Sequence, residues 1–180
     1  MEDHLAQGSA VAEVVSTLGA PELIVELGSG GGVPGLIVAS AFPSTHFVLI
    51  ERRGRRAASL ELAVSQLGWS GRVRVMEADA GDVARSSYRG TADVVLARSF
   101  GPPPVVVEYG LPLLRVGGDL VVTGRPEPTE WPVAALAAVG LGEMTWSSAR
   151  GWNIGTCRST RVADETLPRR GAIPRRRPLF

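Results

Sequence analysis

The sequence predicts an α/β fold, a Rossmann-like, mostly parallel seven-stranded sheet with helices on both faces. Short apolar runs alternate along the chain with segments of helical periodicity. The first run, residues 23–27, stops at a cluster of glycines, and a Gly-Gly pair at 117–118 leads into a later run. With 180 residues, 44% of them hydrophobic, the chain is long enough to form one domain with a substantial core.

The spacing of apolar residues, and the Gly and Pro residues that end each segment, predict the positions of the helices and strands. Strands are expected at residues 23–27, 46–50, 73–77, 92–97, 119–123, 143–148 and 156–163, the last two forming a hairpin. Helices are expected at residues 1–20, 35–41, about 52–67, 105–114 and 131–139. In the helix at 52–67, the residues expected to face the core are Ala57, Leu60, Val64 and Leu67. Residues 1–166 then form the domain, with 1–20 as a short N-terminal helix, and 167–180 form an Arg- and Pro-rich C-terminal extension that lies extended over it.

Charge is unevenly distributed along the chain. All 19 basic residues are arginine, and residues 150–180 hold eight of them against two acids, a net charge of +6. The preceding residues hold 11 arginines against 16 acids, a net charge of −5. A basic end on an acidic body indicates a polyanionic partner. The single cysteine, Cys157, excludes an internal disulfide, and no segment reads as a membrane span or signal peptide, so we expect a cytoplasmic protein.

Residues 23–35, Leu-Ile-Val-Glu-Leu-Gly-Ser-Gly-Gly-Gly-Val-Pro-Gly, predict a strand, a glycine turn and a helix start that bind a nucleotide-type cofactor. Gly30, Gly32 and Gly35 fit the Gly-x-Gly-x-x-Gly pattern of dinucleotide folds. Glu26, two residues before Gly28, instead resembles the first motif of S-adenosylmethionine (SAM) methyltransferases, whose acid binds the ammonium group of the cofactor directly or through water. A pyrophosphate beside Glu26 would be repelled, so SAM is the favoured cofactor.

Further acids and an arginine are expected at the carboxyl ends of later strands, which line the ligand crevice in open α/β sheets. Glu51 lies 23 residues after Gly28, the spacing at which such folds place an acid over a ribose. Asp79 and Ala80 fall where methyltransferases hold the adenine. Arg98 follows the strand at 92–97 and is expected at the mouth of the site. Four arginines among residues 52–56 oppose the dipole of the helix that they begin, which favours a functional role for them.

The chain resembles the RsmG (GidB) family of bacterial guanine-N7 methyltransferases of 16S ribosomal RNA. The segments that carry this resemblance are residues 26–35 with Pro34-Gly35, Glu51 with Gly54-Arg55-Arg56, Ala97-Arg98-Ser99, Glu108-Tyr109 through Gly117-Gly118, and residues 167–179. The sequence departs from the family in three places. The helical N-terminus is shorter, Thr123-Gly124-Arg125 stands where a Lys-Gly pair is usual, and Asp79 and Gly81 replace frequent Arg and Glu.

Together, the motifs and the resemblance imply two sets of binding residues. Those expected to contact the cofactor SAM are Glu26, Gly28, Ser29, Gly30, Gly32, Val33, Glu51, Asp79, Ala80, Gly81 and Arg98. Those expected to contact RNA phosphates are Arg55, Arg56, Arg125, Arg169, Arg170, Arg175, Arg176 and Arg177. The implied partner is 16S ribosomal RNA or the small ribosomal subunit, and no metal site or membrane is expected.

No catalytic residue is assigned, because guanine N7 carries a lone pair and no proton. His4 and His46 are expected far from the crevice, and Arg98 has at most a positioning role. Phe100 is expected either to stack on the base or to pack in the core. Three alternatives stay open: a SAM-dependent methyltransferase of a small molecule, a non-catalytic SAM- and RNA-binding relic, and a NAD-dependent oxidoreductase.

Overall fold

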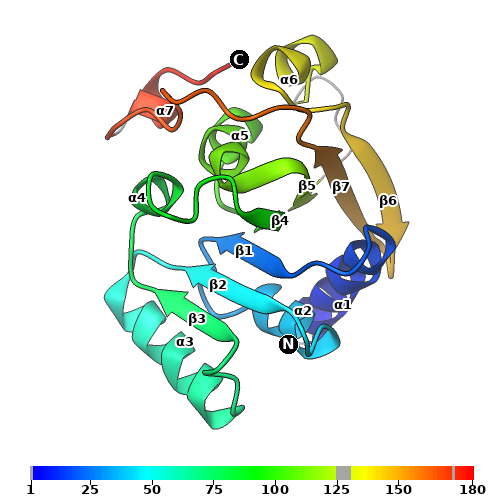
Figure 1. Ribbon diagram of the computed structural model, residues 1–180. Helices are drawn as coiled ribbons and strands as arrows, with labels where there is room; N and C mark the ends of the chain where they lie inside the picture. The colour runs from blue at the N-terminus through cyan, green and yellow to red at the C-terminus, as the bar shows by residue number, and fades with distance from the viewer. Residues whose placement is uncertain (1, 125–130, 172) are drawn as a thin grey trace.

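The computed structural model describes residues 2–124, 131–171 and 173–180 and contains one seven-stranded sheet (Figure 1). The strands are β1 (Leu23–Leu27), β2 (His46–Ile50), β3 (Val73–Met76), β4 (Ala92–Ala97), β5 (Leu114–Thr123), β6 (Thr145–Ala149) and β7 (Trp152–Arg158). The helices are α1 (Glu2–Thr17), α2 (Gly35–Ala41), α3 (Gly54–Gln66), α4 (Ala80–Ala84), α5 (Pro103–Gly110), the 3-10 turn η1 (Leu111–Leu113), α6 (Val133–Val139) and α7 (Ile173–Arg176).

The strand order β3-β2-β1-β4-β5-β7-β6 makes the sheet doubly wound. The first five strands are parallel, and β7 pairs antiparallel with both β5 and β6. The order reverses between β1 and β4, and in open α/β sheets this switch point holds the ligand crevice at the carboxyl ends of the strands. The predicted fold class is confirmed.

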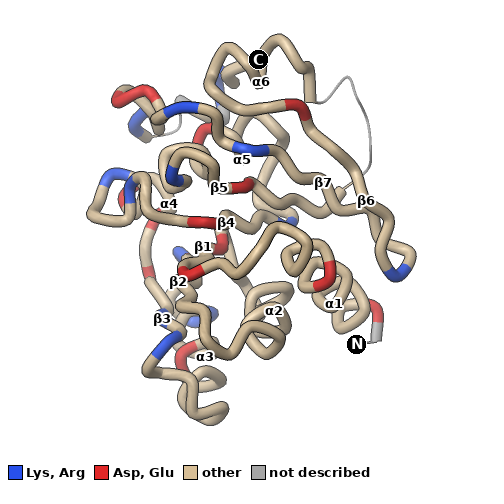
Figure 2. The backbone as a smooth tube through the Cα atoms, turned by 45° about the vertical axis from the view of Figure 1, so that its right-hand side comes forward, with Lys and Arg blue, Asp and Glu red and all other residues tan. Residues whose placement is uncertain are grey.

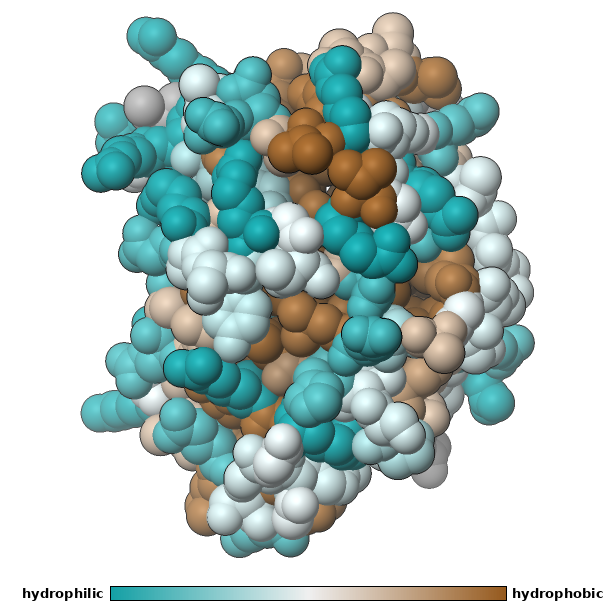
Figure 3. Space-filling view, in the orientation of Figure 1, coloured by the Kyte–Doolittle hydropathy of each residue, from teal (hydrophilic) through white to brown (hydrophobic). Residues whose placement is uncertain are grey.

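Two hydrophobic clusters, one on each face of the sheet, form the core. Helices α1, α2 and α3 pack over one face, and α4, α5 and α6 pack over the other (Figure 1). The central strands are buried on both faces, as in Val94–Ala97 of β4, which explains why they read as continuous apolar runs. Figure 3 shows that hydrophilic residues cover most of one face of the molecule and that hydrophobic surface is confined to small separate areas.

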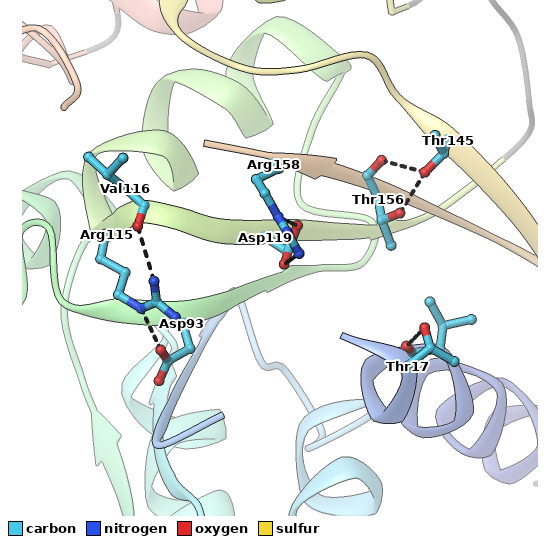
Figure 4. Close-up of polar contacts among 9 residues, drawn as sticks. Thr17, Asp93, Arg115, Val116, Asp119, Thr145, Thr156 and Arg158 are labelled. Carbon is cyan, nitrogen blue, oxygen red and sulfur yellow. Dashed lines mark hydrogen bonds and ion pairs between the residues drawn. The ribbon is translucent and has the colours of Figure 1, made fainter. Parts of the chain in front are cut away.

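Local patterns located β1, β2, β4 and α2 at the predicted residues, but β5 begins earlier than predicted, at Leu114. The Gly-Gly pair does not form a turn before β5. It lies inside this strand, at an irregularity where the register against β4 shifts between Ala92 and Val94. Gly117 has φ +80°, and a Cβ on Gly118 would lie 2.8 Å from the Ala92 carbonyl oxygen. Ion pairs hold the strand on both sides of this bulge, Arg115 with Asp93 of β4 and Arg158 of β7 with Asp119 (Figure 4).

Three further predictions of local structure were wrong. The closing hairpin turns at Arg150 and Gly151, with φ +50° and +79°, so β7 begins at Trp152 and not at residue 156. Leu67 follows α3 and is 48% exposed, so it does not belong to the inner face of that helix. The C-terminal tail is not extended throughout, because it contains α7. In the described part of the chain, no helix is both long and apolar enough to cross a membrane.

Candidate cofactor site

The glycine loop after β1 has the backbone shape that its sequence predicts. Gly28, Gly30 and Gly32 have φ values of +68°, +56° and +89°, a region that side chains disfavour. The loop closes through a hydrogen bond from the Gly32 amide to the Ser29 carbonyl, 2.8 Å, and the Ser29 amide donates to the Ile50 carbonyl at the end of β2, 2.9 Å. The loop is therefore fixed against the neighbouring strand, at the switch point of the sheet.

A pocket of about 530 Å³ opens beside this loop. Five of the predicted cofactor residues line it: Gly28, Glu51, Asp79, Ala80 and Gly81. The other six, which do not line it, are Glu26, Ser29, Gly30, Gly32, Val33 and Arg98. The structure thus separates the predicted set into a group that faces the pocket and a group that forms or supports the loop behind it.

Glu51 is held at the pocket wall by two backbone amides. Its Oε2 accepts a hydrogen bond from the Gly30 amide, 3.0 Å, and its Oε1 accepts one from the Arg53 amide, 2.8 Å. The side chain is only 5% exposed, yet it lines the pocket. Fixed in this way at the end of β2, the carboxylate has the placement that a ribose-binding acid requires.

Asp79 is both a helix cap and a pocket residue. Its Oδ1 accepts a hydrogen bond from the Gly81 amide, 2.8 Å, at the start of α4. A Cβ on Gly81 would lie 3.1 Å from Cε1 of Tyr109, so the glycine lets the tyrosine ring of α5 approach the pocket wall. Sequence reasoning missed Tyr109 as a lining residue, although it stands in one of the segments that carry the family resemblance.

Glu26 lies behind the loop and is buried. Its Oε1 accepts a hydrogen bond from the Gly35 amide, 3.0 Å, and Gly35 has no side chain that would collide with the carboxylate. Burial raises the pKa of Glu26 to about 7, an effect that Ser29, the Gly35 amide and the charge of Arg98 only partly offset. The loop screens this carboxyl group from the pocket, so a water-mediated contact with a cofactor fits its position better than a direct one.

Two buried polar atoms at the glycine loop suit SAM as a ligand. Among the described residues, Glu26 Oε2 and Ser29 Oγ are buried without a hydrogen bond of good geometry, directly at the glycine loop. Buried polar atoms of this kind are normally satisfied by a ligand or by ordered water. The buried oxygens of Glu26 and Ser29 suit the ammonium group of SAM, and the carboxylate of Glu51 suits the ribose of its nucleoside.

Arg98 lies at the end of β4, but it points to the outside of the loop. Its Nη1 donates to the Val33 carbonyl, 3.3 Å, and its Nη2 lies 3.0 Å from Nδ1 of His4. Because a guanidinium only donates, the imidazole nitrogen accepts in this bond. His4 thus contacts Arg98 behind the loop, and neither residue lines the pocket. No local signal pairs residues 4 and 98, which only the packing of α1 brings together.

Arg169 is not available for the role that the sequence predicted for it. Its amide and Nε both donate to Glu108 Oε1, each at 2.8 Å, and its Nη2 donates to Glu108 Oε2 at 2.6 Å. The Glu108 side chain is fully buried, so the arginine neutralises a charge inside the protein. This is a correction to the predicted RNA-binding set.

The remaining predicted RNA-binding arginines differ in how far they are described. Exposed side chains are those of Arg55, Arg56, Arg170, Arg176 and Arg177. Arg125 lies outside the described residues, and the side chain of Arg175 is not described. Figure 2 shows basic positions of the tail on the side of the molecule that carries α4 and α5.

The C-terminal tail completes the pocket. Arg85 donates to the Pro168 carbonyl, 3.0 Å, and Arg89 donates to the Leu167 carbonyl, 2.7 Å. These bonds hold the tail against the end of α4, so that Arg169 and Gly171 line the cofactor pocket. Sequence reasoning did not place the tail there, because each bond joins residues about eighty positions apart.

Two further cavities differ in their relation to this site. A pocket of about 110 Å³ adjoins the cofactor pocket and shares Ser99 and Phe100 with it. A third, of about 570 Å³, lies near the starts of β1, β2 and β3, and no predicted site residue lines it. Within residues 2–124, 131–171 and 173–180, no three His, Cys, Asp or Glu side chains are grouped so that they could hold a metal ion.

Comparison with known proteins decides between the two cofactors. The sequence model of GidB, described as rRNA small subunit methyltransferase G, matches residues 1–135. The chain belongs to the GidB family. The family and the fold together support SAM, and the dinucleotide alternative is not supported.

Curated relatives named ribosomal RNA small subunit methyltransferase G agree with this assignment. The protein of Rubrobacter xylanophilus is 41% identical over 122 residues, which cover 66% of this chain and 46% of that protein. The protein of Synechococcus sp. strain CC9902 is 34% identical over 188 residues, 94% of this chain and 74% of the relative. The protein of Syntrophomonas wolfei is 30% identical over 187 residues, 99% and 86% respectively. The chain therefore spans less than half of the first relative and most of the other two.

Solved structures of other proteins share the fold. Geranyl diphosphate methyltransferase in complex with SAM superposes with a TM-score of 0.67 at 13% identity, covering 87% of this chain and 85% of that one. Cofactor-bound Rv0187 from MTB gives a TM-score of 0.63 at 20% identity, covering 85% and 79%. At these identities the likeness concerns the fold alone.

Proposed function

We propose that this protein transfers a methyl group from SAM to guanine N7 in 16S ribosomal RNA. Membership of the GidB family supports the reaction class, and the placement of the predicted residues supports the cofactor contacts. In this proposal Glu51 binds the ribose hydroxyls, and the segment of Asp79, Ala80 and Gly81 holds the adenine. Gly28 lets the backbone approach the cofactor, while Arg98 positions the loop from behind through Val33.

The observation that carries the RNA part of the proposal is the basic rim of the cofactor pocket. Arg52, Arg53 and Arg56 are exposed and line its mouth. SAM is itself a cation, so exposed guanidinium groups at the mouth would not serve its binding. Phosphates of a nucleic acid would be neutralised by them, with release of counterions.

The reaction asks little of the protein beyond positioning. SAM supplies an electrophilic methyl group bonded to a sulfonium sulfur. The N7 lone pair of guanine forms the new N–C bond, the C–S bond breaks, and its electron pair stays on sulfur, so that no proton has to move. The residues at the ends of β1, β2 and β4 contribute by holding the reacting atoms about 3 Å apart and in line.

Other arginines extend the proposed RNA contact beyond the rim. The exposed side chains of Arg55, Arg170, Arg176 and Arg177 are candidates, and Arg125 and Arg175 remain predictions. Residues 167–180 thus combine two roles in the proposal, because the tail closes the cofactor pocket and also carries charges for RNA. A ribosomal substrate would place the enzyme in the cytoplasm.

The test is transfer of labelled methyl from SAM to small ribosomal subunits that lack the modification. We expect label in the 16S RNA, falling steeply as salt is raised. Saturable SAM binding without transfer to RNA would favour the non-catalytic relic. Transfer to small molecules but not to RNA would favour the small-molecule enzyme. Absence of SAM binding by calorimetry, against a NAD control, would contradict the cofactor assignment itself.

A further inference from the structure

The pocket of about 110 Å³ lies at the carboxyl ends of β4 and β5, next to the cofactor pocket. Ser99 and Phe100 line both pockets, so the two are separated by one turn of chain. The remaining walls include Thr123 and Gly124 at the end of β5, together with Trp131 and Trp146. A group bound here would lie beside a cofactor in the neighbouring pocket.

The two pockets differ sharply in charge. Eight charged side chains line the cofactor pocket, whereas the residues described as lining the second pocket include none. Three of its lining residues are aromatic. Phosphates require cationic partners, while unpaired bases stack on aromatic side chains. The second pocket thus has the chemistry to receive a neutral, flat ring, and its volume suits a base without its sugar and phosphate.

Trp146 reaches this pocket from the outermost strand because the strand beside it carries a glycine. Trp146 of β6 pairs with Gly155 of β7, which pairs with Val122 of β5. A Cβ on Gly155 would lie 3.0 Å from the indole Cη2 and 3.0 Å from Val122 Cγ2. The same Cη2 lies 3.6 Å from the Cβ position of Gly124 at the pocket. The indole therefore crosses β7, and it is only partly buried.

Phe100 lies at the boundary that the two pockets share. Ser99, just before it, has φ +51°, a value that non-glycine residues rarely adopt and that often marks functional sites. The Phe100 ring meets Tyr109 edge to face, with ring centres 5.6 Å apart and an interplanar angle of 76°. Its Cδ2 lies 3.0 Å from the Cβ position of Gly28. The turn at Ser99 thus directs the ring toward the glycine loop.

We propose that the second pocket receives the methyl-accepting base, which stacks against Trp146 between the walls formed by Trp131 and Phe100. The hydroxyl groups of Ser99 and Thr123 then face the edges of the base. The side chains described as lining the pocket offer no carboxylate, imidazole or amine to act as a general base, which suits a ring nitrogen that has no proton to lose. This assignment rests on the proposed function and adds the specificity-determining residues to it.

The test compares two substitutions in the same hairpin. Trp146→Ala removes the stacking surface, whereas Trp152→Ala removes a tryptophan that packs on the opposite face of the sheet. For Trp146→Ala we expect kcat/KM for undermethylated small subunits to fall about 5- to 150-fold, the range for loss of a stacking aromatic. The dissociation constant for SAM should stay within about twofold. Trp146→Phe should restore most of the activity, and Trp152→Ala should transfer methyl at close to the wild-type rate.

The possible outcomes distinguish a failure of the base-pocket proposal from a failure of the proposed function on which it rests. Wild-type activity in Trp146→Ala would overturn the base pocket and leave the methyltransferase proposal standing. If Trp146→Ala lowered SAM affinity and methyl transfer equally, Trp146 would only support the fold, and this result would also overturn the base-pocket proposal. Absence of methyl transfer by the wild-type protein would contradict the proposed function. In that case, quenching of tryptophan fluorescence by 16S RNA with S-adenosylhomocysteine present, and smaller in Trp146→Phe than in the wild type, would still support the pocket, whereas equal quenching in the two proteins would refute it.

Discussion

The two adjoining pockets at the carboxyl edge of the sheet are built in different ways. The cofactor pocket is formed by backbone and by charged groups, with glycines of positive φ, the amide-held carboxylate of Glu51 and an arginine rim. The described lining of the second pocket is neutral and partly aromatic, and it comes from β4, the turn after it, α5, β5, β6 and the segment before α6. We therefore expect one pocket to bind a charged, hydrogen-bonding ligand and the other to bind a flat ring.

A substitution at Gly28 should destroy the first pocket outright. In Gly28→Val, a branched side chain enters a backbone with φ +68°, with its Cβ 3.0 Å from Phe100 Cδ2, and fills the pocket wall. We expect SAM affinity to fall at least about 100-fold in calorimetry, a loss of about 2.7 kcal/mol or more.

The matched control for that substitution lies three residues away. Gly31 has no positive φ and nothing within 4 Å of its Cβ position. Gly31→Ala should therefore bind SAM almost as the wild type does. If both variants bound SAM normally, the glycine loop would not be the cofactor site. The first pocket could then no longer be distinguished from the second as the one that binds SAM.

Removing Arg169 should weaken the wall that the tail adds to the first pocket. Arg169→Ala leaves the fully buried Glu108 carboxylate without its ion-pair partner. We expect the free energy of unfolding to fall by about 3 kcal/mol, toward the low end for broken buried pairs because Arg169 itself is partly exposed. Chemical denaturation measures this. A change below about 0.5 kcal/mol would mean that the pair contributes no more than a surface ion pair.

The buried acid behind the loop predicts a pH-dependent stability. Burial raises the pKa of Glu26 from its ordinary value of 4.5 to about 7, so the folded protein keeps this proton to higher pH than the unfolded chain does. Its contribution to stability is therefore full below pH 4.5, is lost as pH rises to about 7, and is constant above that. The loss corresponds to about 3 kcal/mol.

Comparison of the wild type with Glu26→Gln isolates this group. The glutamine variant keeps an oxygen that can accept the Gly35 amide hydrogen bond but cannot ionise. Its unfolding free energy relative to the wild type should therefore rise between pH 4.5 and 7. A difference that stays constant over this range would show that Glu26 is already ionised at low pH in the folded protein.

The smallest expected effect concerns the rim. Arg170 neighbours Arg169 but is exposed, so Arg170→Ala should leave the unfolding free energy within about 0.5 kcal/mol of the wild type. If Arg170 contacts a phosphate, the slope of log affinity for RNA against log salt should become shallower by about 0.7 to 0.9. An unchanged slope would exclude Arg170 from the contact surface. It would not affect either pocket.

The sequence predicted the first pocket well and the second hardly at all. The loop at Gly28 to Gly32, Glu51 and Asp79 lie in short local motifs that follow strands, and the chain direction alone brings strand ends together. Trp146 becomes a pocket residue only because Gly155 and Val122 align with it across two other strands. The pairing of Trp146 with Gly155 follows from the two-residue turn at Arg150 and Gly151, which was not predicted from the sequence. The pairing of Gly155 with Val122 joins strands that only tertiary packing brings together.

The C-terminal tail also makes contacts that could not be predicted from the sequence. Its charge predicted a role in binding a polyanion, and Arg170 stays exposed in agreement with that. Composition could not distinguish Arg169, whose partner Glu108 lies 61 residues earlier in a buried helix. The pairing of His4 with Arg98 is likewise a product of helix packing across 94 residues.

The most direct test of the two-pocket account is the identity of the methylated nucleoside. Undermethylated small subunits would be incubated with the protein and SAM, and the 16S RNA digested to nucleosides for mass spectrometry. A base pocket whose described lining is neutral and contains no general base predicts 7-methylguanosine. Methyl groups on an exocyclic amine or a ribose hydroxyl, acceptors that must lose a proton, would contradict the account.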